Sequence, residues 1–170
     1  MIPQNPFVPF IQSLLFAVLL VSPAYSLELS ELVASDVQKV DDGFQFIEGP
    51  VWHIDGYLLF SDIPANRIYK FTPGQNSTIF RRDSGKSNGL TFDRKGRLIA
   101  CEHDNRRVSR TEPDGSIITI ADTWQGKKFN SPNDCAVRSD GMIFFTDPNW
   151  GLGNRTREID FNGVYAVMPG

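Results

Sequence analysis

A short motif occurs three times along the chain, and this repeat restricts the possible folds more than any other feature of the sequence. Its copies start at Glu48, Asn88 and Asn133, so the starts are 40 and 45 residues apart. An internal period of about 40 to 50 residues indicates an array of similar supersecondary units. In each copy a glycine turn follows at the same offset, as Asp55-Gly56, Lys95-Gly96 or Asp140-Gly141.

Each copy of the motif predicts a set of short antiparallel strands. Apolar runs flank the turn, and Asp-Gly between apolar runs predicts a hairpin because both residues accept positive φ. A third strand is expected at 67–71, 107–110 and 164–167, and a fourth at 78–80 and 116–120. Four strands in about 40 to 45 residues are typical of one propeller blade. We therefore predict an all-β fold, a β-propeller of four-stranded antiparallel blades. A sandwich of hairpins is the alternative, but it does not explain the constant offset of the turn.

The repeats cover residues 44–170, with blades starting near 48, 88 and 133. A ring of blades closes with about 4 to 8 members. The chain contains three copies of the motif and reaches Gly170 within the third. We therefore expect an incomplete propeller, a fragment of a longer one unless other chains complete the ring.

The first 26 residues contain no charged side chain, and residues 7–21 are almost entirely apolar. The small residues Ala24 and Ser26 follow at a separation that suits signal peptidase. A membrane-spanning helix needs about 20 apolar residues, so this segment is too short. We predict a secretory signal peptide at 1–26, an N-terminal segment at 27–43, and a secreted, extracellular protein with no stable membrane association after cleavage. An uncleaved anchor is the alternative.

Sequons and cysteines bear on the same question of export. Asn76 and Asn154 begin Asn-x-Ser/Thr sequons in polar segments, and we predict both as glycosylation sites. The chain has 2 cysteines, Cys101 and Cys135, which an oxidising compartment would allow to form one disulfide. Two separate free thiols are the alternative, and both possibilities remain open.

Charge and motif content exclude several classes of function. Charged residues make up 22% of the chain, the net charge is −3, and both signs are mixed along the sequence. This gives no electrostatic reason to expect nucleic acid or an anionic membrane as partner. The sequence has no glycine-rich phosphate loop and no Gly-x-Ser-x-Gly motif, so covalent serine catalysis is unsupported.

Acidic residues recur opposite the repeat starts. In a hairpin the second strand retraces the first, so the residue 14 positions after each start lies back beside it. These residues are Asp62, Glu102 and Asp147. If the first strands line the channel, carboxylate and amide oxygens converge at one mouth, which suits a hard cation such as Ca²⁺. Alternatively, strand-end carboxylates such as Asp62 and Asp147 accept hydrogen bonds from loop N–H groups.

Histidine and tryptophan positions separate by the same geometry. His103 follows Glu102 at the predicted mouth, where it would orient a substrate or move a proton, or else belong to a solvated charged loop. His53 lies near the turn and is expected to be a surface or packing residue. Trp52, Trp124 and Trp150 are most simply structural: Trp52 belongs to the strand pattern, whereas Trp124 and Trp150 lie in connections, where an aromatic side chain would floor a pocket or pack between blades.

Three motifs in order carry a resemblance to a known family. EGPVW at 48–52 continues to LLFSDIPANRIYKF at 58–71, followed by NGLTFDRKGRLIACEHDNRRV at 88–108 and NSPNDCAVRSDGMIFFTDP at 130–148. Over about residues 44–170 the chain resembles SMP-30/gluconolactonase/LRE-like proteins. The resemblance implies a six-bladed propeller with one divalent metal in its channel, usually Ca²⁺, with Zn²⁺, Mg²⁺ or Mn²⁺ as other possibilities.

The resemblance also implies an activity, the hydrolysis of sugar lactones such as glucono-1,5-lactone. Glu48 matches the metal-binding glutamate of the family, and Asn133 matches an asparagine that contacts metal or substrate. With the geometry above, Asn88, Glu102 and His103 become further candidates for substrate contact. The remaining ligands and the general base are expected beyond Gly170, so we expect the chain by itself to be inactive. A non-catalytic binding propeller and a relative of strictosidine synthase or paraoxonase are the alternatives.

Overall fold

The computed structural model describes residues 35–168. The chain divides into two compact units, Met1–Gln38 and Lys39–Gly170, and the strands below belong to the second. The predicted signal peptide at 1–26 and the first residues of the segment at 27–43 lie outside the described residues. Within the described part, no helix is long and apolar enough to cross a membrane.

Two four-stranded antiparallel sheets form the first two blades, with their strands in sequence order. Both begin at a repeat start, and the observed strands coincide with the predicted ones to within two residues. Blade 1 consists of β1 (Ile47–His53), β2 (Tyr57–Asp62), β3 (Arg67–Phe71) and β4 (Thr78–Arg82). Blade 2 consists of β5 (Ser87–Phe92), β6 (Leu98–Glu102), β7 (Arg107–Thr111) and β8 (Ile117–Ala121).

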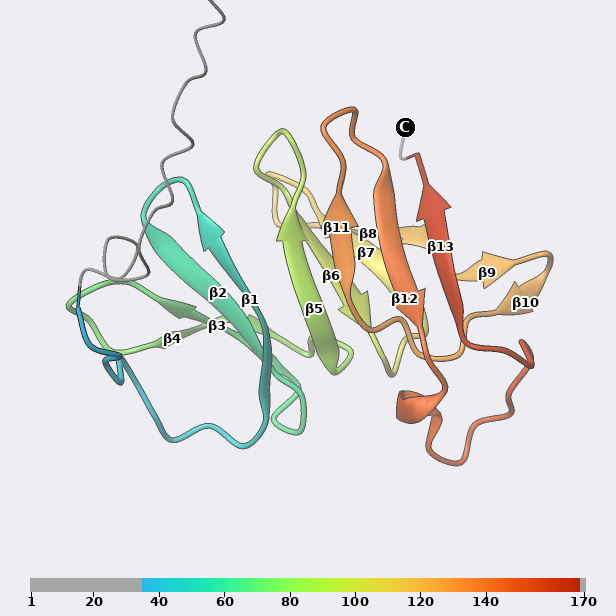
Figure 1. Ribbon diagram of the computed structural model, residues 1–170, viewed down its shortest axis with the longest axis horizontal. Helices are drawn as coiled ribbons and strands as arrows, with labels where there is room; N and C mark the ends of the chain where they lie inside the picture. Colours follow the sequence, from blue (N-terminus) through green and yellow to red (C-terminus); the bar gives the residue numbers. More distant parts are fainter. Residues whose placement is uncertain (1–34, 169–170) are drawn as a thin grey trace, which may run out of the picture. The chain divides into compact units, whose positions relative to one another are not determined.

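The third repeat forms a three-stranded sheet, which we call blade 3. Its strands are β11 (Cys135–Val137), β12 (Ile143–Asp147) and β13 (Gly163–Val167). A two-stranded hairpin, β9 (Thr123–Trp124) and β10 (Lys127–Lys128), precedes it, and a short 3-10 helix, η1 (Trp150–Leu152), follows β12. Neither the hairpin nor η1 was expected from the sequence. Figure 1 shows the three sheets in succession, with β5 between β1 and β11.

The predicted hairpin turns occur in all three blades and share one geometry. Gly56, Gly96 and Gly141 have φ values of 84°, 73° and 97°, a region that favours glycine. Each glycine N–H donates to the carbonyl oxygen three residues earlier, at 3.0, 2.9 and 2.9 Å. The constant offset of the turn in the sequence is therefore a constant turn in the structure. The predicted all-β fold with four-stranded antiparallel blades is confirmed.

Strand β6 joins the blades because both of its faces are buried. Successive side chains of a strand point to opposite faces. Leu98 and Ala100 pack with Leu59 and Ile68 of blade 1, whereas Ile99 and Cys101 belong to the cluster shared with blade 3. Full burial of a large aliphatic side chain contributes about 1.5 to 3 kcal/mol. The rest of that second cluster consists of Val108, Phe129, Ile143, Phe145 and Ile159.

The two cysteines lie in the contact between blades 2 and 3. Both are free thiols in the structure, with Cys101 buried and Cys135 half-buried. Burial raises the pKa of the Cys101 thiol well above its usual value, and a hydrogen bond with Cys135 raises it further. Cys101 is therefore protonated and packs as a small apolar group.

Candidate functional site

The three repeat starts, Glu48, Asn88 and Asn133, come together at one pocket. They lie at or just before the first strands of the three blades, which are neighbours in space (Figure 1). The pocket has a volume of about 280 Å³. We call it the inner pocket, and it is lined by Glu48, Gly49, Pro50, Asn88, Leu90, Asn133, Asp134 and Trp150.

Irregular backbone at the repeat starts aims these side chains. The pairing of β1 with β2 shifts register between Glu48 and Val51, and the pairing of β5 with β6 shifts at the equivalent place, between Ser87 and Leu90. Such bulges bend a strand and redirect its side chains, and they are frequent beside functional sites. Glu48 and Asn88 therefore owe their orientation to a local feature that the two blades share.

Close backbone approach at two glycines brings the starts together. A Cβ atom on Gly49 would collide with the carbonyl oxygen of Asn88, and one on Gly89 would lie 2.7 Å from the carbonyl oxygen of Asn133. The N–H of Gly89 donates to that same oxygen of Asn133 at 2.7 Å. The absence of side chains at both positions allows three inner segments to meet around one space.

The inner pocket offers oxygen atoms of two kinds, carboxylates from Glu48 and Asp134 and amide oxygens from Asn88 and Asn133. One oxygen of Asp134 also accepts the N–H of Cys135 at 2.8 Å. Among the described residues, no three His, Cys, Asp or Glu side chains are grouped as a metal site. Two carboxylates with amide oxygens fit a hard divalent cation such as Ca²⁺. They supply only part of the roughly 6 to 8 oxygen ligands that this ion takes. The residues present therefore fit a partial calcium site.

His103 supports the pocket from beneath Asn133. It is 7% exposed, and its Nε2 lies 3.4 Å from the amide nitrogen of Asn133. Burial lowers the pKa of His103, and the charge of Arg155 lowers it further against the opposing effect of Asp104. A neutral imidazole accepts the Asn133 N–H through Nε2, and the amide oxygen of Asn133 is then the remaining group for a ligand.

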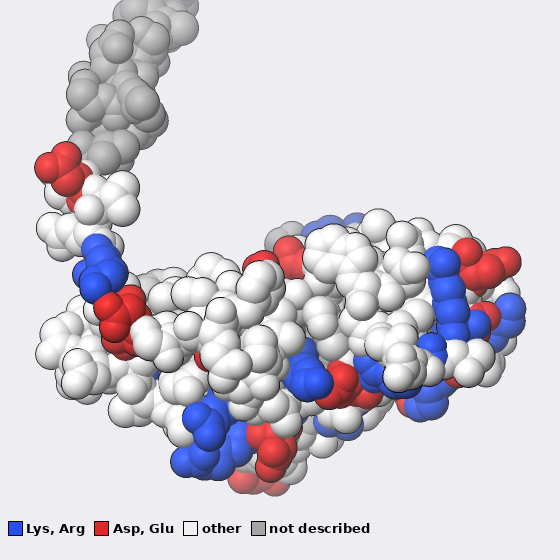
Figure 2. All heavy atoms as spheres, turned by 90° about the horizontal axis from the view of Figure 1, so that it is seen from below, with Lys and Arg blue, Asp and Glu red and all other residues white. Residues whose placement is uncertain are grey.

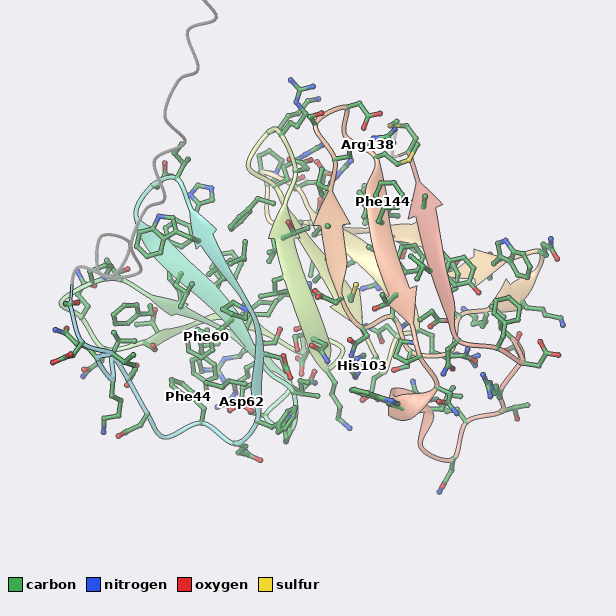
Figure 3. All side chains as sticks on the ribbon, viewed as in Figure 1. Phe44, Phe60, Asp62, His103, Arg138 and Phe144 are labelled. Carbon is green, nitrogen blue, oxygen red and sulfur yellow. The ribbon has the colours of Figure 1, made fainter. Side chains whose placement is uncertain are left out.

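Arg155 fixes the loop that covers His103. Its guanidinium donates to the carbonyl oxygens of His103 and Leu152 at 3.0 and 2.9 Å, and also to those of Asp104 and Gly151. A Cβ atom on Gly151 would collide with Ser131 Oγ, so η1 lies directly against Ser131 and His103. Figure 3 shows His103 beside η1, at the opposite end of blade 3 from Arg138 and Phe144.

The carboxylates of Asp62 and Asp147 do not line the inner pocket. Asp62 accepts the N–H groups of Gln45 and Phe46 at 3.1 and 3.3 Å (Figure 3 shows Asp62 near Phe44). Asp147 accepts those of Asn130 and Ser131 at 2.8 and 2.6 Å. Each acid therefore holds the loop that leads into its blade, as the alternative interpretation of strand-end carboxylates predicts.

Glu102 also lies away from the inner pocket, inside the contact between blades 1 and 2. It is fully buried and accepts hydrogen bonds from Arg81, Arg107, Asn105 and Ser109 at 2.5 to 2.7 Å. Burial alone raises the pKa of Glu102, but these hydrogen bonds and the charge of Arg81 hold it below its usual value. The oxygens of Glu102 are committed to these neighbouring donors, and contact of Glu102 with substrate stays a prediction.

Sequence reasoning did not assign Asp134 to the pocket and left Trp150 between two roles. Asp134 directly follows Asn133, and both precede β11, so the alternation of strand side chains does not separate them. Trp150 reaches the pocket because Arg155 ties its loop to the segment around His103. The local sequence pattern does not predict such a contact between distant segments. The sequon residues Asn76 and Asn154 are exposed, and their glycosylation stays a prediction.

A second hollow, on blade 1, is lined mainly by apolar side chains, including Phe44, Ile47, Leu58 and Phe71. A binding site for a small polar molecule needs a few converging polar groups. Glu48 and Asp41 are the charged residues of its lining. The inner pocket, with four polar side chains from three blades, is the better candidate.

Fold and site together define a class of protein: consecutive propeller blades whose first strands bring carboxylate and amide oxygens together in one pocket. The SMP-30/gluconolactonase/LRE-like region matches residues 46–170, and the chain belongs to this family.

Named relatives agree with this assignment. A gluconolactonase of Zymomonas mobilis is 34% identical over 156 residues, covering 81% of this chain and 44% of the relative. A pentonolactonase of Haloferax volcanii is 27% identical over 135 residues, covering 76% and 44%. The solved structure of a gluconolactonase from Xanthomonas campestris is 31% identical with a TM-score of 0.72, covering 76% of this chain and 46% of that one. The chain thus spans less than half the length of these relatives.

Proposed function

We propose that the chain forms part of a secreted, calcium-dependent lactonase that hydrolyses sugar lactones. The observation that carries the proposal is the convergence of Glu48, Asn88 and Asn133, one from each repeat, on one oxygen-lined pocket. Relatives at 34% and 27% identity bear the names gluconolactonase and pentonolactonase. The substrate class and the metal are taken from these names and from the donor set.

The side chains of the inner pocket divide the work of binding. Glu48 and Asp134 supply the negative charge that would hold the cation, together with the amide oxygen of Asn133. The amide of Asn88 would hydrogen-bond the lactone or its hydroxyl groups. A bound Ca²⁺ ion would supply Lewis-acid polarisation of the lactone carbonyl and a more acidic water.

We assign no general base to the described residues. The carboxylates of Asp62, Glu102 and Asp147 are held by backbone or side-chain donors away from the pocket. The relatives extend over more than twice the aligned length. We propose that further blades, such as the rest of these relatives would form, supply the base and the remaining ligands. The chain alone should therefore show little or no turnover.

The metal site is tested by binding Tb³⁺, a luminescent substitute for Ca²⁺, to the purified chain. Trp150 lines the same pocket, so excitation of the indole should sensitise the bound ion. Glu48→Gln removes one ligand charge and should weaken binding about tenfold or more. Asp55→Asn, an exposed carboxylate outside the pocket, is the matched control and should bind as the parent does. Equal affinities for all three proteins would exclude Glu48 as a ligand.

Activity is tested in a chimera that joins residues 39–170 to the later blades of the Zymomonas mobilis gluconolactonase. We expect release of acid from glucono-1,5-lactone that a calcium chelator abolishes and added Ca²⁺ restores. A folded chimera whose activity is unaffected by the chelator would overturn the calcium dependence, and one that releases no acid would overturn the lactonase assignment.

A further inference from the structure

The exposed ring of Trp150 distinguishes the inner pocket from an ordinary polar hollow. The residue is 77% exposed, although it lines a pocket whose other members are mostly polar or glycine. An aromatic ring in the lining of a polar pocket offers a ligand apolar contact area beside the polar groups that orient it. Trp124, by comparison, is 37% exposed and packs against Phe161 and Tyr165, with ring centroids 5.7 and 5.9 Å away.

Hydrogen bonds and close packing hold the backbone of the loop that presents Trp150. Leu152, two residues later, is 7% exposed, and Gly151 lies against Ser131 and His103 with no room for a side chain. Arg155 holds the carbonyl oxygens of Gly151 and Leu152 while also binding those of His103 and Asp104. The backbone that carries the indole is therefore held in place before any ligand arrives, which lowers the entropic cost of binding.

We propose that Trp150 is the residue by which the inner pocket recognises the ring of a sugar lactone, a role that rests on the proposed function. The face of an indole carries partial negative charge and attracts the polarised C–H groups on one face of a sugar ring. With that face on Trp150, the hydroxyl groups at the ring edge meet the amides of Asn88 and Asn133. The aromatic ring thus positions the substrate over the oxygen ligands.

The chain provides its own controls because it contains 3 tryptophans, Trp52, Trp124 and Trp150. In a ¹⁵N-labelled sample each gives one indole N–H signal, which the variants W52F, W124F and W150F assign. Freshly dissolved glucono-1,5-lactone and the stable product gluconate are titrated separately. We expect a saturable shift of the Trp150 signal while the signals of Trp52 and Trp124 stay in place.

Affinity is then followed through the backbone amide signal of Asn88 in the variants. Trp150→Ala should weaken binding about five- to tenfold, and Trp150→Phe should retain part of the affinity because a smaller ring still stacks. Trp124→Ala should leave the affinity unchanged. A Trp150 signal that stays in place, whether Asn88 shifts or not, overturns the proposal, as do parallel unsaturated shifts of all three indoles.

The result is separable from the lactonase test. Saturable binding at Trp150 together with an inactive chimera would uphold this inference and remove the proposed function. An active chimera whose affinity and KM are unchanged by Trp150→Ala would do the reverse.

Discussion

Single residues in this chain show how identical chemistry takes different roles according to its hydrogen-bond partners. Glu48 is the first repeat start, and Glu102 lies on β6, the strand that pairs with β5 of the second repeat. Glu48 lines the inner pocket, whereas Glu102 is fully buried among Arg81, Arg107 and two neutral donors. Sequence spacing singled out both residues, but it could not show that Arg81, on β4 of the neighbouring blade, donates to Glu102.

Glu102→Gln should therefore affect stability much more than an exposed charge change does. Removing one partner of a buried ion pair costs about 3 kcal/mol or more, because the buried Arg81 is left without a compensating charge. Asp140→Asn, which breaks an exposed pair with Arg138, is the control and should have little effect. Urea unfolding monitored by circular dichroism measures both, and similar losses in the two variants would contradict the structural role of Glu102.

The same residue predicts a pH dependence of stability. Because the folded-state pKa of Glu102 is below its ordinary value, ionised Glu102 contributes stability above its unfolded pKa of about 4.3. That contribution is lost as the pH falls through the lower folded-state pKa. The difference in unfolding free energy between the parent and Glu102→Gln should therefore be constant near neutral pH and shrink in this acidic window. A difference that grows with acid would refute the sign of the shift.

At the scale of elements, the strands were predictable and the connections were not. The strands follow from apolar runs around a glycine turn, a local pattern that the three blades share. The hairpin of β9 and β10 has two residues in each strand, too short for a periodic signal, and η1 is fixed by Arg155 rather than by its own sequence. The pocket was therefore predictable at the repeat starts, Glu48, Asn88 and Asn133, whereas the role of Trp150 was left open.

Gly89→Ala tests whether close contact of the inner segments builds the pocket. The added methyl would lie 2.5 Å from Asp134 Oδ1 and 2.7 Å from the carbonyl oxygen of Asn133, so blade 3 must move away from blade 2. We expect a loss of about 1 to 3 kcal/mol in stability, typical of overpacking, and weaker Tb³⁺ binding. Gly74→Ala, at a turn with open space around it, should cost stability through backbone strain alone and leave Tb³⁺ binding intact.

For the whole described unit, blade 2 is the centre of stability because both of its faces are covered. Strand β6 contributes to both apolar clusters, whereas blades 1 and 3 each contribute to one. The face seen in Figure 2 carries Lys and Arg side chains interspersed with Asp and Glu. Repulsion between like charges is therefore not concentrated on this face.

Hydrogen exchange should therefore be slowest in β6, which contributes to both clusters, and in its paired neighbour β7, which contributes Val108 to one of them. Mass spectrometry of peptides from the labelled chain compares them with β1 and β13, which should exchange sooner. Equal protection across the three blades would instead indicate one cooperative unit that opens as a whole.

The unequal spacing of the repeats also bears on how such chains evolve. The starts are 40 and 45 residues apart, and the hairpin of β9 and β10 occupies the longer interval, between the last strand of blade 2 and the start of blade 3. The added residues lie in the connection between blades 2 and 3. Apart from Phe129, they lie outside both apolar clusters. Gene duplication can thus multiply blades and let their junctions diverge in length, while the turn and the paired strands within each copy keep a fixed spacing.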